Sequence, residues 1–129
     1  MMPEVSPEAR QWWEATRERR LLVQTCRSCG HRQHYPRAMC VRCGGVHLGW
    51  VEAAGAGTIY SFTRSHRSPD PATFEPPYTI VIVTLDEGPR ILATVTGTGV
   101  RCDAPVRLAW TPLADGRNLP VFETDPEEN

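Results

Sequence analysis

The spacing of apolar side chains predicts a short amphipathic helix near the N-terminus. Ser6, Pro7 and Glu8 form a typical helix start, because serine can cap a first turn, proline tolerates the first helical position and an acid suits the positive helix end. The pattern predicts a helix that extends to about Arg20. We expect its apolar stripe to pack against the chain's own domain. The stripe consists of Ala9, Trp12, Trp13 and Thr16, which follow the i, i+3, i+4, i+7 spacing of one helix face.

Short apolar runs separated by turn residues predict β-strands after the helix. Residues 21–23 (LLV) and 50–52 (WVE) are strand-like segments on either side of a cysteine-rich stretch. The run YTIVIVTLD is almost continuously apolar, which favours a central strand buried on both faces. Five strands in about seventy residues favour a small barrel of the OB type, since a sandwich needs about seven. The expected strands are Thr58–His66, Tyr78–Asp86, Arg90–Thr96, Pro105–Trp110 and Leu119–Phe122.

The predicted fold is therefore mainly β, with an N-terminal helix, a cysteine-rich ribbon and a C-terminal five-stranded OB-fold barrel. We divide the chain into residues 1–24 (helix and lead-in strand), 25–49 (ribbon) and 50–129 (barrel). A chain of 129 residues has room for one modest domain, or for a very small module attached to a domain of about 70 to 80 residues. A large catalytic core does not fit.

The composition predicts where the protein resides. Hydrophobic residues make up 40% of the chain and charged residues 22%, which is typical of a globular protein. No apolar run approaches the ~18 residues of a membrane span, and the N-terminus lacks the basic-then-apolar order of a secretory signal. We therefore expect a cytoplasmic protein with reduced thiols and no membrane partner.

Residues 26–45 read CRSCGHRQHYPRAMCVRCGG and contain two C-x-x-C-G turns. This spacing lets the two sulfurs of each turn point the same way, so that four thiolates can converge tetrahedrally on one ion. Gly30 and Gly44 permit positive φ, which lets the backbone curl over the sulfurs and donate N–H groups to them. Disulfides are the alternative, but a reducing compartment disfavours them. The expected metal ligands are Cys26, Cys29, Cys40 and Cys43.

Zinc is the metal that we expect at these four cysteines. Iron also accepts a tetrahedral set of four thiolates, and an iron electron carrier is the weaker alternative. Four thiolates close the coordination shell, so the ion is predicted to be structural. His31 and His34 lie between the turns and are expected to be solvated or hydrogen-bonded rather than ligands. Cys102 is expected to be a thiol in a loop or at the barrel rim.

No residue is assigned a catalytic role from the sequence. The chain contains no paired carboxylates at an evident pocket, no G-x-S-x-G turn, no phosphate-binding loop and no nucleophile beside a base. Any reaction is therefore expected to take place in a partner protein.

The distribution of charge raises the alternative of nucleic-acid binding. Residues 1–43 hold eight arginines and four acids, whereas residues 44–129 hold six arginines and eleven acids, although the net charge is only −1. A basic ribbon beside an OB-like barrel is compatible with nucleic acid. The predicted strands, however, lack the basic and aromatic interleaving of a single-strand platform. Tyr60, Phe62 and Arg64 alternate along the first strand, but such aromatics more often belong to a core.

Several stretches in order also carry a family resemblance. They are QWWEATRERRLLVQTCRSCGHRQHYPRAMCVRCGG, WVEAAGAGTIYSFTRSHR, PPYTIVIVTLDEG and LPVF, and they cover nearly the whole chain. In combination they resemble the family of two-part proteins with a rubredoxin-like zinc ribbon and a C-terminal OB-fold that accompany thiolase-like enzymes. The family usually shows a pattern like G-x-P-V before its last long strand. Here Asp103–Val106 reads DAPV, and aspartate is compatible with a turn.

The resemblance implies a noncatalytic subunit of a hetero-oligomer. Its thiolase-like partner would carry out acyl transfer, or retro-aldol cleavage of a steroid side-chain CoA thioester, while the OB domain binds or channels the acyl-CoA. Arg64, His66 and Arg67 lie at the end of the first barrel strand and are candidates to meet the phosphates of coenzyme A. A solvated strand end is an equally good interpretation of these residues. Phe74 and Tyr78 are candidates for contact with acyl-CoA or with the partner.

Overall fold

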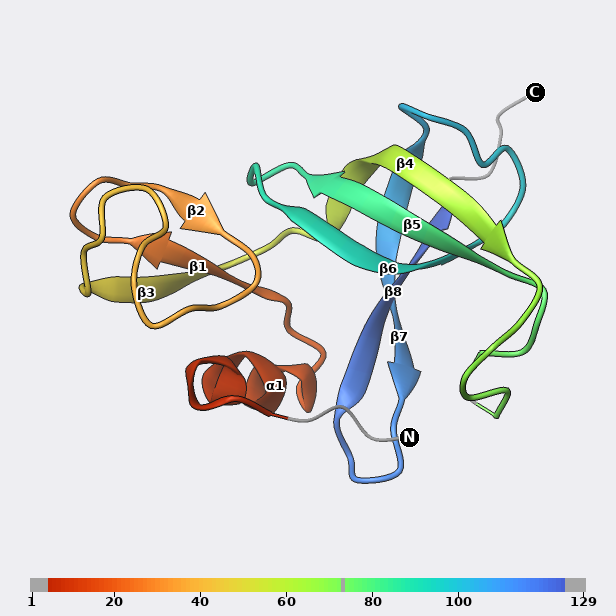
Figure 1. Cartoon of the computed structure of the whole chain (residues 1–129), viewed down its shortest axis with the longest axis horizontal. Coiled ribbons are helices and arrows are strands. Elements are labelled where there is room, and N and C mark those ends of the chain that lie inside the picture. Colours follow the sequence, from red (N-terminus) through yellow and green to blue (C-terminus); the bar gives the residue numbers. More distant parts are fainter. Residues whose placement is uncertain (1–4, 73, 125–129) are drawn as a thin grey trace.

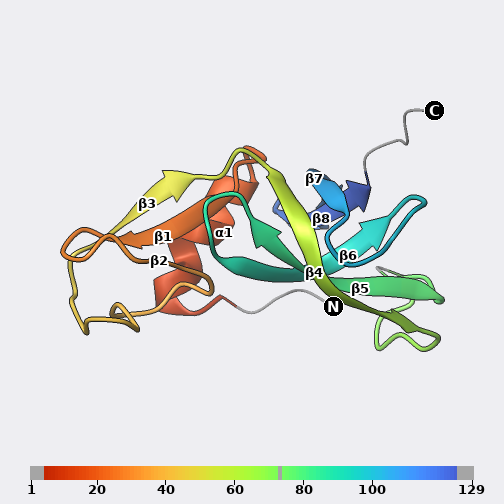
Figure 2. The same cartoon turned by 90° about the horizontal axis from the view of Figure 1, so that it is seen from above.

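The computed structural model describes residues 5–72 and 74–124 and contains two separate sheets (Figure 1). A three-stranded ribbon sheet lies at one end of the molecule and a five-stranded barrel at the other, and a second view from above shows the same separation (Figure 2). The elements are η1 (Pro7–Ala9), α1 (Arg10–Thr16), β1 (Leu22–Cys26), β2 (Arg32–Gln33), β3 (Leu48–Glu52), β4 (Ala56–Ser65), β5 (Tyr78–Leu85), β6 (Arg90–Thr96), β7 (Pro105–Pro112) and β8 (Asn118–Thr124).

The N-terminal helix is shorter than predicted. It ends at Thr16 rather than near Arg20, because the chain turns back at Arg19, whose φ is 57°. Ser6 precedes the 3-10 turn η1 without a side-chain capping bond. The predicted stripe does face inward, since Trp12 is buried together with Ala15 and Thr16.

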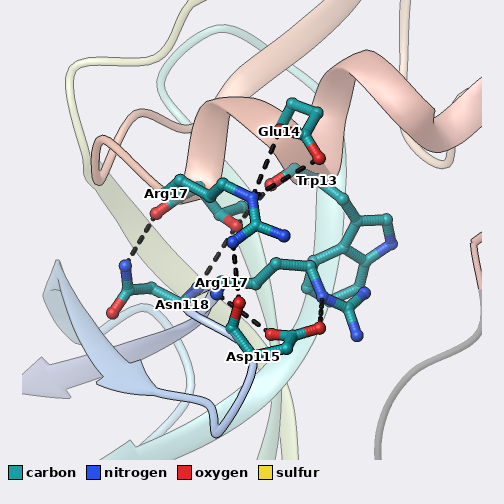
Figure 3. A network of polar contacts seen from close by, with 7 residues as sticks. Trp13, Glu14, Arg17, Asp115, Arg117 and Asn118 are labelled. Atoms are coloured by element: carbon teal, nitrogen blue, oxygen red, sulfur yellow. Dashed lines mark hydrogen bonds and ion pairs between the residues drawn. The ribbon is translucent and has the colours of Figure 1, made fainter.

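The N-terminal helix is attached to the barrel by a polar network (Figure 3). The side-chain amide of Asn118 donates to the carbonyl of Thr16 at 2.8 Å, and the guanidinium of Arg17 donates to the carbonyl of Asp115 at 2.7 Å. The guanidinium of Arg117 lies 4.9 Å from the ring centroid of Trp13 and also donates to the Asp115 carboxylate. The turn between β7 and β8 and the start of β8 therefore hold the C-terminal end of the helix against the barrel.

The ribbon sheet has the order β2-β1-β3, and both pairings are antiparallel. Residues 48–52 of β3 pair with residues 22–26 of β1, so the sheet joins segments from all three of the ranges into which the sequence was divided. Two buried glutamines hold the intervening loop. Gln33 donates to the side-chain oxygen of Gln24 at 2.6 Å, and Gln24 donates to the carbonyl of Arg37 at 2.9 Å.

The barrel is closed in the order β4-β5-β6-β8-β7, which confirms the predicted OB-type barrel. All neighbouring strands are antiparallel except β6 and β8, which are parallel. Five strands lie close to their predicted ranges, and β6 has the predicted bounds. The last two strands are longer than predicted because they pair with each other from Val106–Thr124 to Pro112–Asn118.

The core of the barrel is formed by one face of each strand. Phe122, Ile59, Val81 and Val83 are fully buried. The prediction that β5 is buried on both faces is wrong, because residues such as Ile82 on its other face are only half-buried. A small antiparallel barrel buries one face of its sheet and leaves the other exposed to water unless another layer covers it.

No helix within residues 5–72 and 74–124 is long and apolar enough to cross a membrane.

Candidate metal centre and neighbouring ligand hollows

The four predicted cysteine ligands converge at one end of the ribbon. Their sulfurs all lie within 4.8 Å of one another, with Cys26 and Cys43 3.6 Å apart and Cys29 and Cys40 3.7 Å apart. These separations exceed the ~2.05 Å of a disulfide bond. Four sulfurs arranged tetrahedrally at about 2.3 Å from a zinc ion are about 3.8 Å from one another. The arrangement therefore fits one zinc ion bound by four thiolates.

The backbone of each C-x-x-C-G turn supports the sulfurs as expected. Gly30 and Gly44 have φ of 80° and 75°, and their N–H groups donate to the carbonyls of Cys26 and Cys40 at 2.8 and 2.9 Å. In the second turn, the N–H of Gly45 lies 3.3 Å from the sulfur of Cys43. Donation from backbone N–H groups stabilises thiolate charge and fixes the orientation of the ligands.

The four thiols influence each other's protonation. The backbone N–H of Cys29 lowers the pKa of Cys26 to about 6. The N–H of Gly45 lowers the pKa of Cys43, but hydrogen bonding with the other three sulfurs, first of all that of Cys26, raises it to about 11. Because the four sulfurs lie so close together, it is unfavourable for all four to be deprotonated at once. A bound dication removes this opposition, because it attracts all four thiolates.

The two histidines of the ribbon are not part of the sulfur cluster. The ring of His34 is partly buried, with its centroid 5.5 Å from that of Trp12 and 4.1 Å from that of Tyr35. Its Nε2 atom is buried without a hydrogen-bond partner among the described residues. Burial lowers the pKa of His34 to about 4.

We expect the partly buried His34 to make stability depend on pH. Its pKa is about 4 in the folded chain and near 6.5 in the unfolded chain, so the unfolded state binds more protons between these values. The contribution is present above about pH 6.5 and is lost as the pH falls toward 4. We expect the free energy of unfolding to fall by about 1 kcal/mol between about pH 7.5 and about pH 5.5. Urea titrations of the zinc-loaded protein measure this change.

The variant His34→Phe is the control for this prediction, because it keeps an aromatic ring and removes the titrating group. Zinc-linked effects are common to both proteins and cancel in the comparison. Equal pH dependence in the two proteins would show that His34 is not responsible.

The structure brings together three of the five residues predicted to contact CoA or a partner. Arg64, Phe74 and Tyr78 line a hollow of about 640 Å³, which we call the arginine hollow. The guanidinium of Arg64 lies 3.4 Å from the hydroxyl of Thr79, and the rings of Phe74 and Tyr78 are stacked with centroids 5.5 Å apart.

The other two predicted contact residues lie elsewhere. His66 and Arg67 are exposed beyond the end of β4 and do not belong to the lining of the arginine hollow. Contact of any of the five residues with coenzyme A or a partner stays a prediction. Cys102 is an exposed thiol in the loop before β7, in agreement with its predicted place.

A second hollow was not predicted from the sequence. It has a volume of about 270 Å³ and is lined by residues of the helix and ribbon on one side and by residues of β5, β6 and β8 on the other. We call it the aromatic groove. Tyr35 was noted as part of a family motif, and Trp12 and Trp13 as a helix stripe, but no local pattern connects them with β6. Its lining includes Trp12, Trp13, His34, Tyr35, Ile80 and Leu92.

Comparisons with known proteins agree with this architecture. The family described as the rubredoxin-like zinc ribbon domain of ChsH2 matches residues 13–46, and the C-terminal OB-fold domain of ChsH2 matches residues 50–111. Among solved structures, a chain of the Ltp2-ChsH2(DUF35) aldolase superimposes with a TM-score of 0.86 and 35% sequence identity. The match covers 95% of this chain and 98% of the other. Together with the sulfur geometry, the ribbon match supports a structural zinc ion.

Two curated relatives are longer than this chain. A probable enoyl-CoA hydratase alpha subunit of Thermomonospora curvata is 37% identical over 123 residues, which are 93% of this chain and 38% of the relative. A DUF35 domain-containing scaffold protein of Pyrococcus furiosus is 30% identical over 87 residues, which are 67% of this chain and 63% of the relative. The chain therefore belongs to the ChsH2 family, in which a rubredoxin-like zinc ribbon is joined to an OB-fold domain.

Proposed function

We propose that this chain is a noncatalytic accessory subunit that binds an acyl-CoA thioester and supports a thiolase-like enzyme in a cytoplasmic hetero-oligomer. The reaction of that enzyme is acyl transfer or retro-aldol cleavage of a CoA thioester. The observation that carries the proposal is the superposition, over 95% of this chain, with a chain of the Ltp2-ChsH2(DUF35) aldolase. The relative in Pyrococcus furiosus, which is described as a scaffold protein, supports the same role.

The chemistry of the described hollows supports a role without catalysis. Four thiolates complete the coordination shell of a zinc ion, so no position remains for a substrate. The described lining of the arginine hollow includes a single carboxylate, that of Glu75, and no cysteine, histidine or lysine. This lining lacks a nucleophile held beside a base, which covalent catalysis requires. The reactive groups are therefore assigned to the partner.

Exposed apolar side chains supply surfaces on which a partner can dock. They occur on both parts of the molecule, and each is at least 45% exposed. Exposed apolar patches on soluble proteins often mark interaction sites. The ribbon carries Met39, Val41 and Val46, and the barrel carries Tyr60, Phe62 and Leu92.

The ribbon arginines favour this role over nucleic-acid binding. The guanidinium of Arg32 lies 3.4 Å from the carbonyl of Glu87, and that of Arg27 lies directly over Gly49. Both guanidinium groups thus lie against the chain's own backbone, although both side chains are exposed. Phosphate binding would have to compete with these contacts.

Co-expression with a thiolase-like protein encoded by a neighbouring gene tests the proposed function. We expect the two chains to copurify in a complex of fixed stoichiometry, measured by size-exclusion chromatography with light scattering. We also expect the partner's turnover of an acyl-CoA thioester to rise when this chain is added. Two separate elution peaks and unchanged turnover, with this chain folded and zinc-loaded, would contradict the proposal. A salt-dependent mobility shift with single-stranded nucleic acid would favour the alternative instead.

A further inference from the structure

The four cysteines of the sulfur cluster differ in their exposure to solvent. Cys26 and Cys40, the first cysteine of each C-x-x-C-G turn, are buried, whereas Cys29 and Cys43, the second cysteine of each turn, are exposed. Metal-bound cysteines are thiolates, and the thiolate is the form that reacts with oxidants. Oxidation is selective for cysteines that are both deprotonated and accessible. An oxidant from solvent is therefore expected to react first at Cys29 or Cys43.

The short sulfur contacts each join an exposed cysteine of one turn to a buried cysteine of the other. The sulfur of Cys43 lies 3.6 Å from that of Cys26, and the sulfur of Cys29 lies 3.7 Å from that of Cys40. Cysteines that sense oxidants are often placed beside a second cysteine that completes a disulfide bond. Each exposed cysteine of the cluster thus has a buried neighbour that can take this role.

The two turns differ in how well a side chain can cover these contacts. Their backbones are equivalent, since the N–H of Cys26 donates to the carbonyl of His31 and the N–H of Cys40 donates to that of Gly45, both at 2.8 Å. A Cβ atom on Gly45 would lie 3.2 Å from the sulfur of Cys43 and 3.6 Å from that of Cys26. Glycine leaves this position without a side chain, whereas the first turn carries a histidine there. The pair formed by Cys26 and Cys43 is therefore the less protected one.

We propose that Cys43 is a site of oxidation by hydrogen peroxide and that Cys26 completes a disulfide bond with it, which releases the metal ion. The Cys43 thiolate attacks one oxygen of the peroxide, so that an S–O bond forms, the O–O bond breaks and hydroxide leaves. The Cys26 thiolate then attacks the Cys43 sulfur, so that an S–S bond forms and the S–O bond breaks with loss of a second hydroxide. The two sulfurs together lose two electrons, which the peroxide takes up. Two thiolates remain, which is fewer than a structural zinc site uses.

The oxidation is expected to change the whole ribbon. Cys26 is the last residue of β1, the central strand of the ribbon sheet. Loss of the ion removes the link between this strand and the second turn, and small zinc modules depend on their ion for folding. Disulfides in a reducing compartment are usually transient, and reduction returns both thiolates. The ribbon thus loses its ion when peroxide is present and can bind it again after reduction.

Treatment of the full, zinc-loaded chain with hydrogen peroxide tests the proposal. A metallochromic indicator follows zinc release, and mass spectrometry of tryptic peptides identifies the first disulfide after the remaining thiols have been alkylated. Trypsin separates the two cysteines of each turn, because Arg27 and Arg42 lie between them. We expect zinc release and a disulfide between the peptides of Cys26 and Cys43 to appear at the same rate. Dithiothreitol and added zinc are expected to restore the loaded protein.

Two matched variants test why the second turn reacts first. The φ of Gly45 lies outside the left-handed region, so alanine fits its backbone and places a methyl group against the sulfurs. Gly45→Ala is expected to slow zinc release about fivefold, because access controls the reactivity of a thiolate. His31→Gly removes the side chain from the equivalent position and is expected to add a second early disulfide, between Cys29 and Cys40. Zinc content is measured in each variant before oxidation.

Two results in the native protein overturn the proposal. The first is full retention of zinc after the exposed thiol of Cys102, which lies outside the cluster, has been oxidised. The second is a first disulfide that joins any pair other than Cys26 and Cys43. Both results are read without a variant, so they hold even if a substitution weakens the ribbon. An unchanged rate of zinc release in fully loaded Gly45→Ala also contradicts the proposal.

Discussion

The variant Cys40→Ser is expected to lose its metal ion and the fold of its ribbon. Cys40 is buried, and its sulfur lies 3.7 Å from that of Cys29, so serine leaves the site with three thiolates. Zinc binding provides about 10–16 kcal/mol of folding free energy in small zinc modules, and a ribbon of this size has little core of its own. We expect zinc content to fall from one ion per chain to nearly none. Amide signals of β1–β3 should lose their dispersion.

Elemental analysis and two-dimensional NMR measure both effects in one sample. Cys102→Ser is the matched control, since Cys102 is an exposed thiol outside the sulfur cluster. This control is expected to keep one zinc ion and a native spectrum. A Cys40→Ser protein that keeps a full equivalent of zinc, or loses zinc with an unchanged ribbon spectrum, would refute the structural role. Red colour and bound iron in the native protein would favour the electron-carrier alternative.

The second large effect is expected from Phe122→Ala in the barrel. Phe122 is 0% exposed and lies on β8 opposite Leu108 of β7 and Val95 of β6. Removing a buried aromatic ring costs about 3–5 kcal/mol through lost burial and the cavity that remains. Because whole domains are stable by only about 5–15 kcal/mol, this change should remove a large part of the barrel's stability.

Urea denaturation at saturating zinc measures this loss while the ribbon stays metal-bound. Phe62→Ala is the control within the same barrel, because Phe62 is 45% exposed. We expect it to cost about 1 kcal/mol or less. Similar losses in the two variants would mean that the core is not centred on Phe122.

The parts that the sequence predicted well depend on local patterns. Two C-x-x-C-G turns determine how four sulfurs can point, and the structure confirms their convergence. Turn residues such as Gly88 and Pro89 mark the hairpin before β6, whose bounds agree with the prediction. Spacing and turn chemistry act over a few residues, which is why a single sequence reveals them.

The parts that were missed depend on contacts between distant segments. The end of the helix is held against the barrel by Asn118, about a hundred residues later, which donates to the carbonyl of Thr16. His34 is partly buried because Trp12 of the helix lies beside its ring. The outer face of β5 is only partly covered at Ile82, which pairs with the 55% exposed Leu92. The spacing of apolar residues within one segment does not indicate which other segment will cover it.

The parallel contact between β6 and β8, which we call the seam, joins the two strands over a short length. Two residue pairs, Val95–Phe122 and Thr96–Glu123, make this contact, whereas β5 and β6 are joined along most of their length. Regions with few backbone hydrogen bonds open at lower free energy than the rest of a domain. Local opening of the barrel is therefore expected to begin between β6 and β8. Thr96 and Val121 of these strands also line the arginine hollow. A ligand bound in this hollow would contact both strands, and we would then expect slower local hydrogen exchange.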